Sequence, residues 1–98
     1  MKARVLFMVY VRPGEEQHFE EAYKQVSKRN LGRIPGQLYD ELLRPASPQD
    51  PYILLSHWNS LEEYREWEQT PAHRESAAPL RQYWLRTHSQ LYTLVENS

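Results

Sequence analysis

The sequence lacks several features on which whole classes of function depend. It has no cysteine, which excludes disulfides, thiolate catalysis and cysteine-based zinc sites. Its formal net charge is −1 and no basic run stands out, so it offers no positive face to the phosphates of a nucleic acid. It contains only three glycines and no glycine-rich phosphate loop. Neither a nucleic-acid partner nor a nucleotide-binding loop is therefore expected.

Long apolar runs are also missing. The run from Val5 to Val11 is too short to cross a membrane, and no small-residue cleavage site follows it. We therefore expect no membrane partner, with the cytoplasm as the default location. Histidines and carboxylates do not recur at metal-ligand spacing, so no metal site is expected.

Aromatic residues, by contrast, are abundant. Three Trp, seven Tyr and two Phe are present among 98 residues. Such side chains fill cores, line pockets for flat ligands and dominate interfaces. A chain of this length predicts a single domain over residues 1–98, with a modest core.

Four segments have the composition of β-strands, at about residues 4–12, 37–44, 52–58 and 88–95. In the first, both alternating sets are apolar, with Val5 and Val9 on one face and Leu6 and Met8 on the other. We therefore expect both faces of this strand to be covered.

Helices are predicted between the strands. Phe19, Ala22, Tyr23 and Val26 recur at helical spacing within residues 15–29. Ser60 and Glu63 match a capping box, which predicts a helix start there. Thr70-Pro71 predicts another start, for a helix that carries Trp84 on its apolar arc, with a kink or restart at Pro79.

This order of elements, β-α-β-β-α-β, predicts the α+β ferredoxin-like fold with a four-stranded antiparallel sheet. In that fold the helices cover one sheet face only. The second face also carries apolar residues, so we expect two sheets to pack face to face as a homodimer, forming a dimeric α+β barrel.

One stretch carries a family resemblance. From Ile53 to Leu80 an apolar strand ends in Trp58, a short helix is capped by Ser60, and Pro71, His73 and Arg74 open the next helix. This pattern resembles the antibiotic-biosynthesis monooxygenase family. The resemblance implies a cofactor-independent monooxygenase that oxidises an aromatic polyketide-type molecule, such as an anthrone or phenol, with O2.

The resemblance and the residue chemistry together give a set of candidate site residues. His73 is the first catalytic candidate, because a half-buried imidazole can act as a base or a donor near neutral pH. Trp67 is the second, as core or as a cavity wall against a flat ligand. Candidate substrate-binding residues are Phe7, Tyr10, Tyr39, His57, Tyr64 and Trp84. A purely structural role is the alternative for each of these residues.

A non-catalytic dimeric domain that binds a small hydrophobic ligand or haem is the alternative function. The haem-degrading branch of the family uses an Asn on the first strand, a Trp on the helix and an axial His ten residues later. Trp67 matches the Trp, but Phe7 takes the place of the Asn and Ala77 that of the His. Haem would therefore need another axial ligand here, such as His73 or His57.

Overall fold

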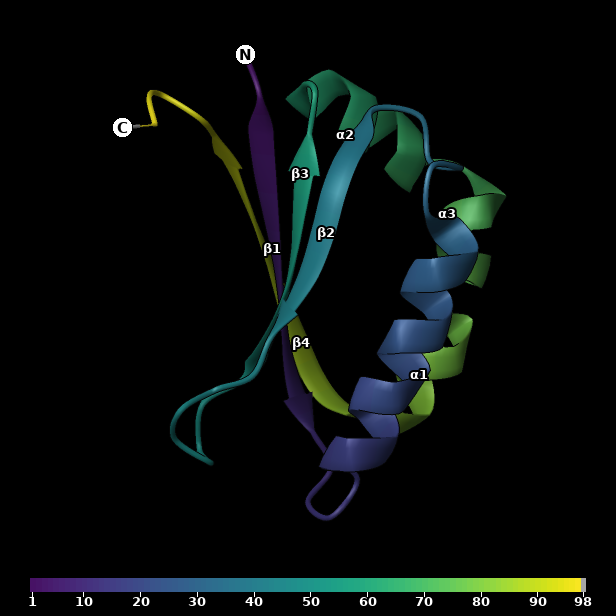
Figure 1. Ribbon diagram of the computed structural model, residues 1–98, viewed down its shortest axis with the longest axis vertical. Helices are drawn as coiled ribbons and strands as arrows, with labels where there is room; N and C mark the ends of the chain where they lie inside the picture. Colours follow the sequence, from purple (N-terminus) through teal and green to yellow (C-terminus); the bar gives the residue numbers. More distant parts are fainter. Residues whose placement is uncertain (98) are drawn as a thin grey trace.

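Four strands form one sheet and the helices cover one side of it, in a computed structural model that describes residues 1–97 (Figure 1). The strands are β1 (Ala3–Val11), β2 (Gln37–Leu43), β3 (Tyr52–Trp58) and β4 (Trp84–Thr93). The helical elements are α1 (Glu16–Asn30), α2 (Leu61–Glu68), α3 (Pro71–Ala77) and the 3₁₀ segment η1 (Ala78–Tyr83).

The sheet is antiparallel with strand order β2-β3-β1-β4. β1 lies in its interior and pairs on both sides, with Ala3 opposite Trp58 of β3 and Thr93 of β4. This arrangement confirms the predicted α+β ferredoxin-like fold.

The sequence prediction was wrong at the junction between the last helix and the last strand. α3 ends at Ala77, η1 follows, and β4 begins at Trp84 rather than at residue 88. Pro79 has no N–H to donate and its ring crowds the preceding turn, so the helix gives way to 3₁₀ geometry. Trp84 therefore lies on a strand, opposite Val11 at a β-bulge, and not on a helix.

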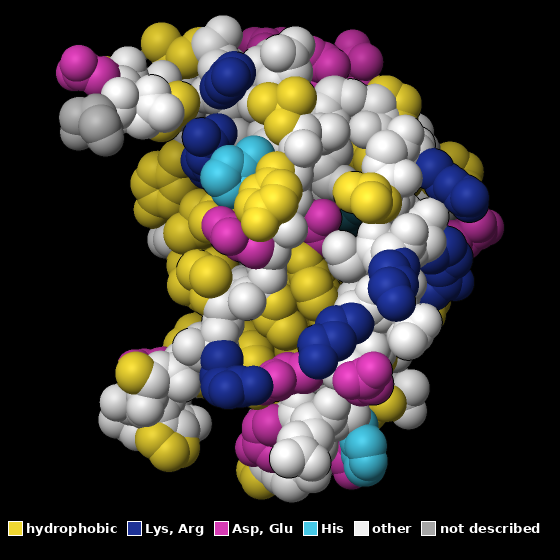
Figure 2. All heavy atoms as spheres, viewed as in Figure 1, with side chains coloured by type: hydrophobic (Ala, Val, Ile, Leu, Met, Phe, Trp, Pro, Cys, Tyr) yellow, Lys and Arg dark blue, Asp and Glu magenta, His cyan; other side chains and the backbone are white. Residues whose placement is uncertain are grey.

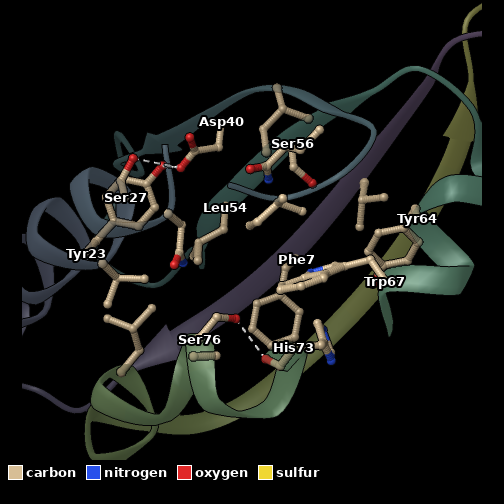
Figure 3. A pocket seen from close by; sticks show the side chains of 18 of the residues that line it. Phe7, Tyr23, Ser27, Asp40, Leu54, Ser56, Tyr64, Trp67, His73 and Ser76 are labelled. Carbon is tan, nitrogen blue, oxygen red and sulfur yellow. Dashed lines mark hydrogen bonds between the residues drawn. The ribbon is translucent and has the colours of Figure 1, made fainter. Parts of the chain in front are cut away.

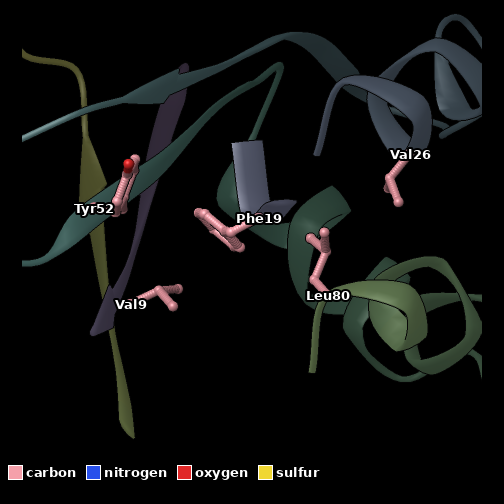
Figure 4. Close-up of a cluster of buried hydrophobic side chains, with 5 residues drawn as sticks. All are labelled: Val9, Phe19, Val26, Tyr52 and Leu80. Atoms are coloured by element: carbon pink, nitrogen blue, oxygen red, sulfur yellow. The ribbon is translucent and has the colours of Figure 1, made fainter. Parts of the chain in front are cut away.

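The inner face of the sheet carries the hydrophobic core. Figure 4 shows five of its side chains meeting between the sheet and the helices: Val9, Phe19, Val26, Tyr52 and Leu80. Phe19 is 0 % exposed, and its ring makes an edge contact with Tyr52 at 5.1 Å between centroids. Full burial of a side chain of this size stabilises the fold by roughly 1.5–3 kcal/mol.

Two side-chain caps hold the short helices after β3. The Ser60 hydroxyl accepts a hydrogen bond from the backbone N–H of Glu63 at 3.1 Å, which confirms the predicted capping box start. The Thr70 hydroxyl accepts one from the N–H of His73 at 3.3 Å. Pro71 occupies the first turn of α3, as expected. These caps fix the junction that carries Trp67 and His73.

A close approach joins the start of β2 to the start of α2. Gly36 has φ of +83°, and a Cβ on it would lie 2.5 Å from Oε2 of Glu63. The Gly36 carbonyl accepts a hydrogen bond from the Asn59 N–H at 2.8 Å. Only glycine provides both this backbone angle and this space.

A charged cluster joins α1 to the other end of the sheet. Arg44 donates two hydrogen bonds to the Glu20 carboxylate, at 2.8 and 2.6 Å, and the Tyr52 hydroxyl donates a third. The Arg44 hydrogen bonds lower the pKa of Glu20 to about 2. The cluster ties the helix to the strands on either side of the β2–β3 loop.

The outer face of the sheet carries a group of apolar residues among polar ones, and within residues 1–97 no helix covers it. Leu6, Met8 and Ile53 alternate with core residues and are only half-buried, while Tyr39 and Tyr92 are exposed. Figure 2 shows hydrophobic side chains on the sheet side and charged side chains over α1. Within residues 1–97, no helix is both long enough and apolar enough to span a bilayer.

Candidate functional site

A cavity of about 290 Å³ lies between the inner face of the sheet and the helices. Its walls come from all four strands and from α1, α2 and α3 (Figure 3). The exposed wall surface is mainly apolar and aromatic, as is usual for a small-molecule site, although nearly half of the lining residues are polar or charged. No cluster of potential metal ligands occurs within residues 1–97.

The structure brings five of the eight candidate residues together around this cavity. They come from β1, α2, α3 and β4, and they are Phe7, Tyr64, Trp67, His73 and Trp84. All three tryptophans of the chain line the cavity, because the buried Trp58 at the end of β3 also borders it. Half of the aromatic residues noted in the sequence, including every tryptophan, therefore line one cavity.

The other three candidates lie outside the cavity. Tyr39 and His57 form an edge-on ring pair, 5.3 Å between centroids, and His57 Nε2 lies 3.4 Å from a Glu41 oxygen. The Tyr10 ring lies under the Arg86 guanidinium at 4.2 Å. Each of the three is one or three residues along its strand from an inner-face residue, so its side chain projects from the outer face.

His73 has a distinctive environment at one end of the cavity. Its ring is edge-on to Trp67, with 6.1 Å between centroids. Its backbone N–H donates to the Thr70 hydroxyl and its backbone carbonyl accepts from the Ser76 hydroxyl. Burial lowers the pKa of His73 below its ordinary value, partly offset by the charge of Glu68. The imidazole is therefore neutral at pH 7 and available as a proton acceptor. Within residues 1–97 its ring nitrogens have no hydrogen-bond partner.

Tyr64 closes the cavity beside this histidine. Its hydroxyl donates to Glu68 Oε2 at 3.3 Å, and its ring packs edge-on against Trp58 at 5.1 Å. Burial, followed by the Glu68 charge, raises the pKa of Tyr64 to about 12. The phenol therefore keeps its proton at neutral pH and can donate it in a hydrogen bond.

Two aromatic rings from adjacent strands form the middle of the cavity. Phe7 of β1 and Trp84 of β4 meet edge to face, 5.1 Å between centroids. The Trp84 indole N–H is buried and, among residues 1–97, no group accepts a hydrogen bond from it. An unpaired buried donor is uncommon in folded proteins.

Sequence reasoning missed a polar group on the opposite side of the cavity. The Asp40 carboxylate on β2 accepts hydrogen bonds from the Tyr23 hydroxyl at 2.6 Å and the Ser27 hydroxyl at 3.0 Å, both from α1. Figure 3 shows this cluster across the cavity from His73 and Trp67. The available signal was a tyrosine and a serine four residues apart on a helix, with an acidic residue on an inward strand position.

These features define a ferredoxin-like α+β domain with a cavity between one sheet face and its helices. Comparison with known proteins identifies it further: the profile of the antibiotic biosynthesis monooxygenase family matches residues 3–79, and the chain belongs to that family.

Individual relatives support the same placement. Protein SchA from Streptomyces halstedii is 28 % identical over 97 residues, which cover 99 % of this chain and 25 % of SchA. The chain spans about a quarter of the length of the curated relatives it matches.

Two solved structures share the fold. SnoaB, a cofactor-independent oxygenase from Streptomyces nogalater, superposes with a TM-score of 0.73 at 20 % identity, covering 98 % of this chain and 94 % of SnoaB. A haem-degrading protein from Mycobacterium tuberculosis gives a TM-score of 0.76 at 20 % identity, covering 100 % and 99 %. At these identities the likeness establishes the fold alone, so the same fold occurs with two different chemistries.

Proposed function

We propose that this protein is a cofactor-independent, monooxygenase-like enzyme that acts on an aromatic polyketide-type molecule such as an anthrone or phenol. The observation that supports this is the neutral, half-buried imidazole of His73 in an aromatic-walled cavity. A volume of about 290 Å³ lies near the lower end of the ligand-pocket range, roughly 300–1,000 Å³, and suits a few fused rings.

The proposed reaction begins with proton transfer from the activated CH2 carbon of an anthrone to His73. The resulting enolate transfers electrons to O2, and a carbon–oxygen bond forms to give a peroxide. The imidazolium returns its proton to the distal oxygen, the second proton leaves the carbon, and the O–O bond breaks. The carbon ends as a quinone carbonyl, so that CH2 and O2 become C=O and H2O. Trp67 forms the wall beside the imidazole and orients the ring of the substrate.

Oxygen uptake by the metal-free protein tests this proposal. With a panel of anthrones and hydroquinones we expect uptake above the rate without protein. His73→Ala should reduce the rate by roughly 10²–10⁴-fold, the usual contribution of a general base. His18→Ala is the matched control, because His18 is exposed on α1 and contacts only Glu15. Equal loss in both variants, or no uptake by a folded wild type, contradicts the proposal.

Binding without turnover is the second candidate function. The observation that favours it is that no carboxylate of residues 1–97 accepts a hydrogen bond from the His73 ring, whereas a general base is usually held by a third group. A flat oxygen trace together with saturable binding of the same anthrones supports this function over catalysis.

Haem binding is a narrower form of the second candidate. His73 presents an unpaired imidazole to the cavity, but the position ten residues after Trp67 is Ala77, and the cavity volume suits a tricycle better than a tetrapyrrole. Titration with haemin separates the two cases. A Soret shift that His73→Ala abolishes supports haem, whereas an unchanged spectrum at stoichiometric haemin removes it.

We also propose that two copies pair through their outer sheet faces. The half-buried Leu6, Met8 and Ile53 support this, because a monomer would leave a contiguous apolar surface in water. Tyr39 and His57 would then lie at the interface rather than in the cavity.

A further inference from the structure

A carboxylate and two hydroxyl groups on one side of the cavity have no role in the proposed oxidation. Tyr23 and Ser27 lie one helical turn apart on α1, so their hydroxyls project to the same side. Both donate to a single oxygen of Asp40, Oδ2, at 2.6 and 3.0 Å. All three residues line the same cavity as His73.

The second oxygen of this carboxylate is unused. A carboxylate offers about four lone-pair positions, and both hydroxyls occupy Oδ2. Within residues 1–97, Oδ1 accepts no hydrogen bond. Asp40 therefore presents one free, strongly accepting oxygen at the edge of a cavity whose neighbouring wall is Leu54.

We propose that Asp40 is a hydroxyl-recognition site, whose Oδ1 accepts a hydrogen bond from a phenolic O–H of the ligand. This rests on the proposed binding of an aromatic molecule in the cavity, and it narrows the substrate class. The substrate is a hydroxylated polycyclic aromatic whose O–H group lies across the cavity from the carbon that His73 deprotonates. In this role Asp40 is a binding and positioning residue and does not take part in the oxidation.

The two hydroxyl donors explain why the carboxylate can serve this role. Burial, followed by the hydrogen bond to Asp40, raises the pKa of Tyr23 well above its usual range, so its phenol always donates. The donors fix the carboxylate between helix and strand and leave Oδ1 in a defined direction. An acceptor fixed in advance costs the ligand little ordering when it binds.

The preference for a hydroxylated ligand comes from the desolvation of Oδ1 when a ligand binds. A ligand with an O–H replaces the water lost from Oδ1 by a hydrogen bond of its own, whereas a ligand with a methyl group leaves that oxygen unpaired. The hydroxylated ligand gains a hydrogen bond to a charged acceptor, whereas the methyl ligand leaves Oδ1 desolvated and unpaired. Together these two effects predict that the hydroxylated ligand binds roughly 10- to 100-fold more tightly.

The chain carries its own reporter for the test. Because Trp58, Trp67 and Trp84 all line the cavity, a bound quinone should quench the intrinsic fluorescence. The probes are 2-hydroxyanthraquinone and 2-methylanthraquinone, whose substituents are similar in size but differ in the O–H. Titrations at pH 6 keep the phenol protonated and give a Kd for each probe.

Asp40→Asn is the informative variant. Its amide oxygen still accepts from Tyr23 and Ser27, so the fold is retained, but the charge is lost and the remaining amide group is a donor. Asp50→Asn is the matched control. It replaces the same carboxylate by an amide, but on the exposed β2–β3 loop and outside the cavity. Thermal melts of both variants monitor folding.

We expect the wild type and Asp50→Asn to prefer the hydroxyquinone by at least about 10-fold, and Asp40→Asn to lose this preference while its Kd for the methylquinone is unchanged. Equal Kd values for both probes in the wild type, or an undiminished preference in Asp40→Asn, overturn the hydroxyl site and leave the aromatic cavity standing. Quenching by neither probe overturns the aromatic cavity and the hydroxyl site with it.

Discussion

The two faces of the sheet come from the same strands and have similar side chains, but they have different surroundings. On the inner face, Val9 and Trp58 are almost completely buried beneath the helices, and the cavity lies between this face and the helices. On the outer face, Leu6 and Met8 are half-buried, and Tyr39 is 57 % exposed.

Residue type alone does not separate these faces. Phe7 and Tyr10 are aromatic residues of one strand, three positions apart, yet Phe7 meets Trp84 in the cavity wall and Tyr10 lies under Arg86 on the outer face. Strand alternation, combined with the side that the helices occupy, decides which aromatic residue can touch a ligand.

The largest expected effect is on stability, and it comes from the packing of α1 against the inner face. Phe19→Ala removes a fully buried ring that packs against the inner face, so we expect the free energy of unfolding to fall by about 3–5 kcal/mol. Leu31→Ala, at a site that is 76 % exposed, should change it by less than about 0.5 kcal/mol. Urea unfolding at fixed protein concentration measures both, and similar losses would mean that the inner core is not the main source of stability.

A charged side chain on the outer face should dissociate the proposed dimer and leave the fold of each copy intact. In Leu6→Lys the ammonium group would have to enter a buried interface, which should weaken the dimer by at least about 2 kcal/mol, or roughly 30-fold. Leu31→Lys makes the same change on the helical side. Sedimentation velocity should then find Leu6→Lys monomeric and Leu31→Lys dimeric. A monomeric wild type contradicts pairing through this face.

The hydrogen-bonded cluster of Glu20, Arg44 and Tyr52 should stabilise the fold less at acidic pH. The pKa of Glu20 is lowered to about 2 from an ordinary value of 4.5. The ionised carboxylate therefore stabilises the fold fully above pH 4.5, and this contribution is lost as the pH falls through about 2. Since Arg44 is exposed and solvent screens the pair, we expect only a small contribution to the free energy of unfolding. Melting temperatures of the wild type and Glu20→Gln should differ at pH 7 and converge near pH 2; a constant difference would exclude the ionised pair as its cause.

The smallest effect concerns protonation inside the cavity. Because burial lowers the pKa of His73, the unfolded chain binds this proton more readily than the native one, and protonation should destabilise the fold slightly as the pH falls below 6.5. NMR titration should find the His73 ring resonances moving at a lower pH than in an unfolded chain. Trp67→Ala exposes the ring and should bring the midpoint back toward the ordinary value. A titration midpoint of His73 above pH 6.5 in the wild type would mean that burial is not the main influence on its pKa.

Much of the fold was predictable because its local signals agree. The apolar, β-branched and aromatic runs of β1 and β3 predicted strands close to the observed bounds. The capping box at Ser60 and the Thr70-Pro71 start did the same for two helices. The end of the last helix was not predictable in this way, because Trp84 satisfies a helical arc in sequence. Pairing with Val11 across the sheet places it on β4 instead.

The candidate site was predictable only in part. Trp67 and His73 follow a recognisable helix junction, so their proximity could be expected. Asp40 gave no such signal, because an acidic residue on a strand usually faces solvent and its two partners come from a helix far back in the sequence. Its role depends on how α1 lies across β2, which is a tertiary property.

The central position of β1 also sets an order of events during synthesis. β1 is made before its two sheet neighbours, and its edges stay open until β3 and then β4 emerge from the ribosome. An open apolar strand edge can pair with another chain, so the interval before β4 arrives is the time of greatest risk of aggregation. A chain cut short before Trp84 would keep that edge permanently open, which makes β4 the strand that completes the fold.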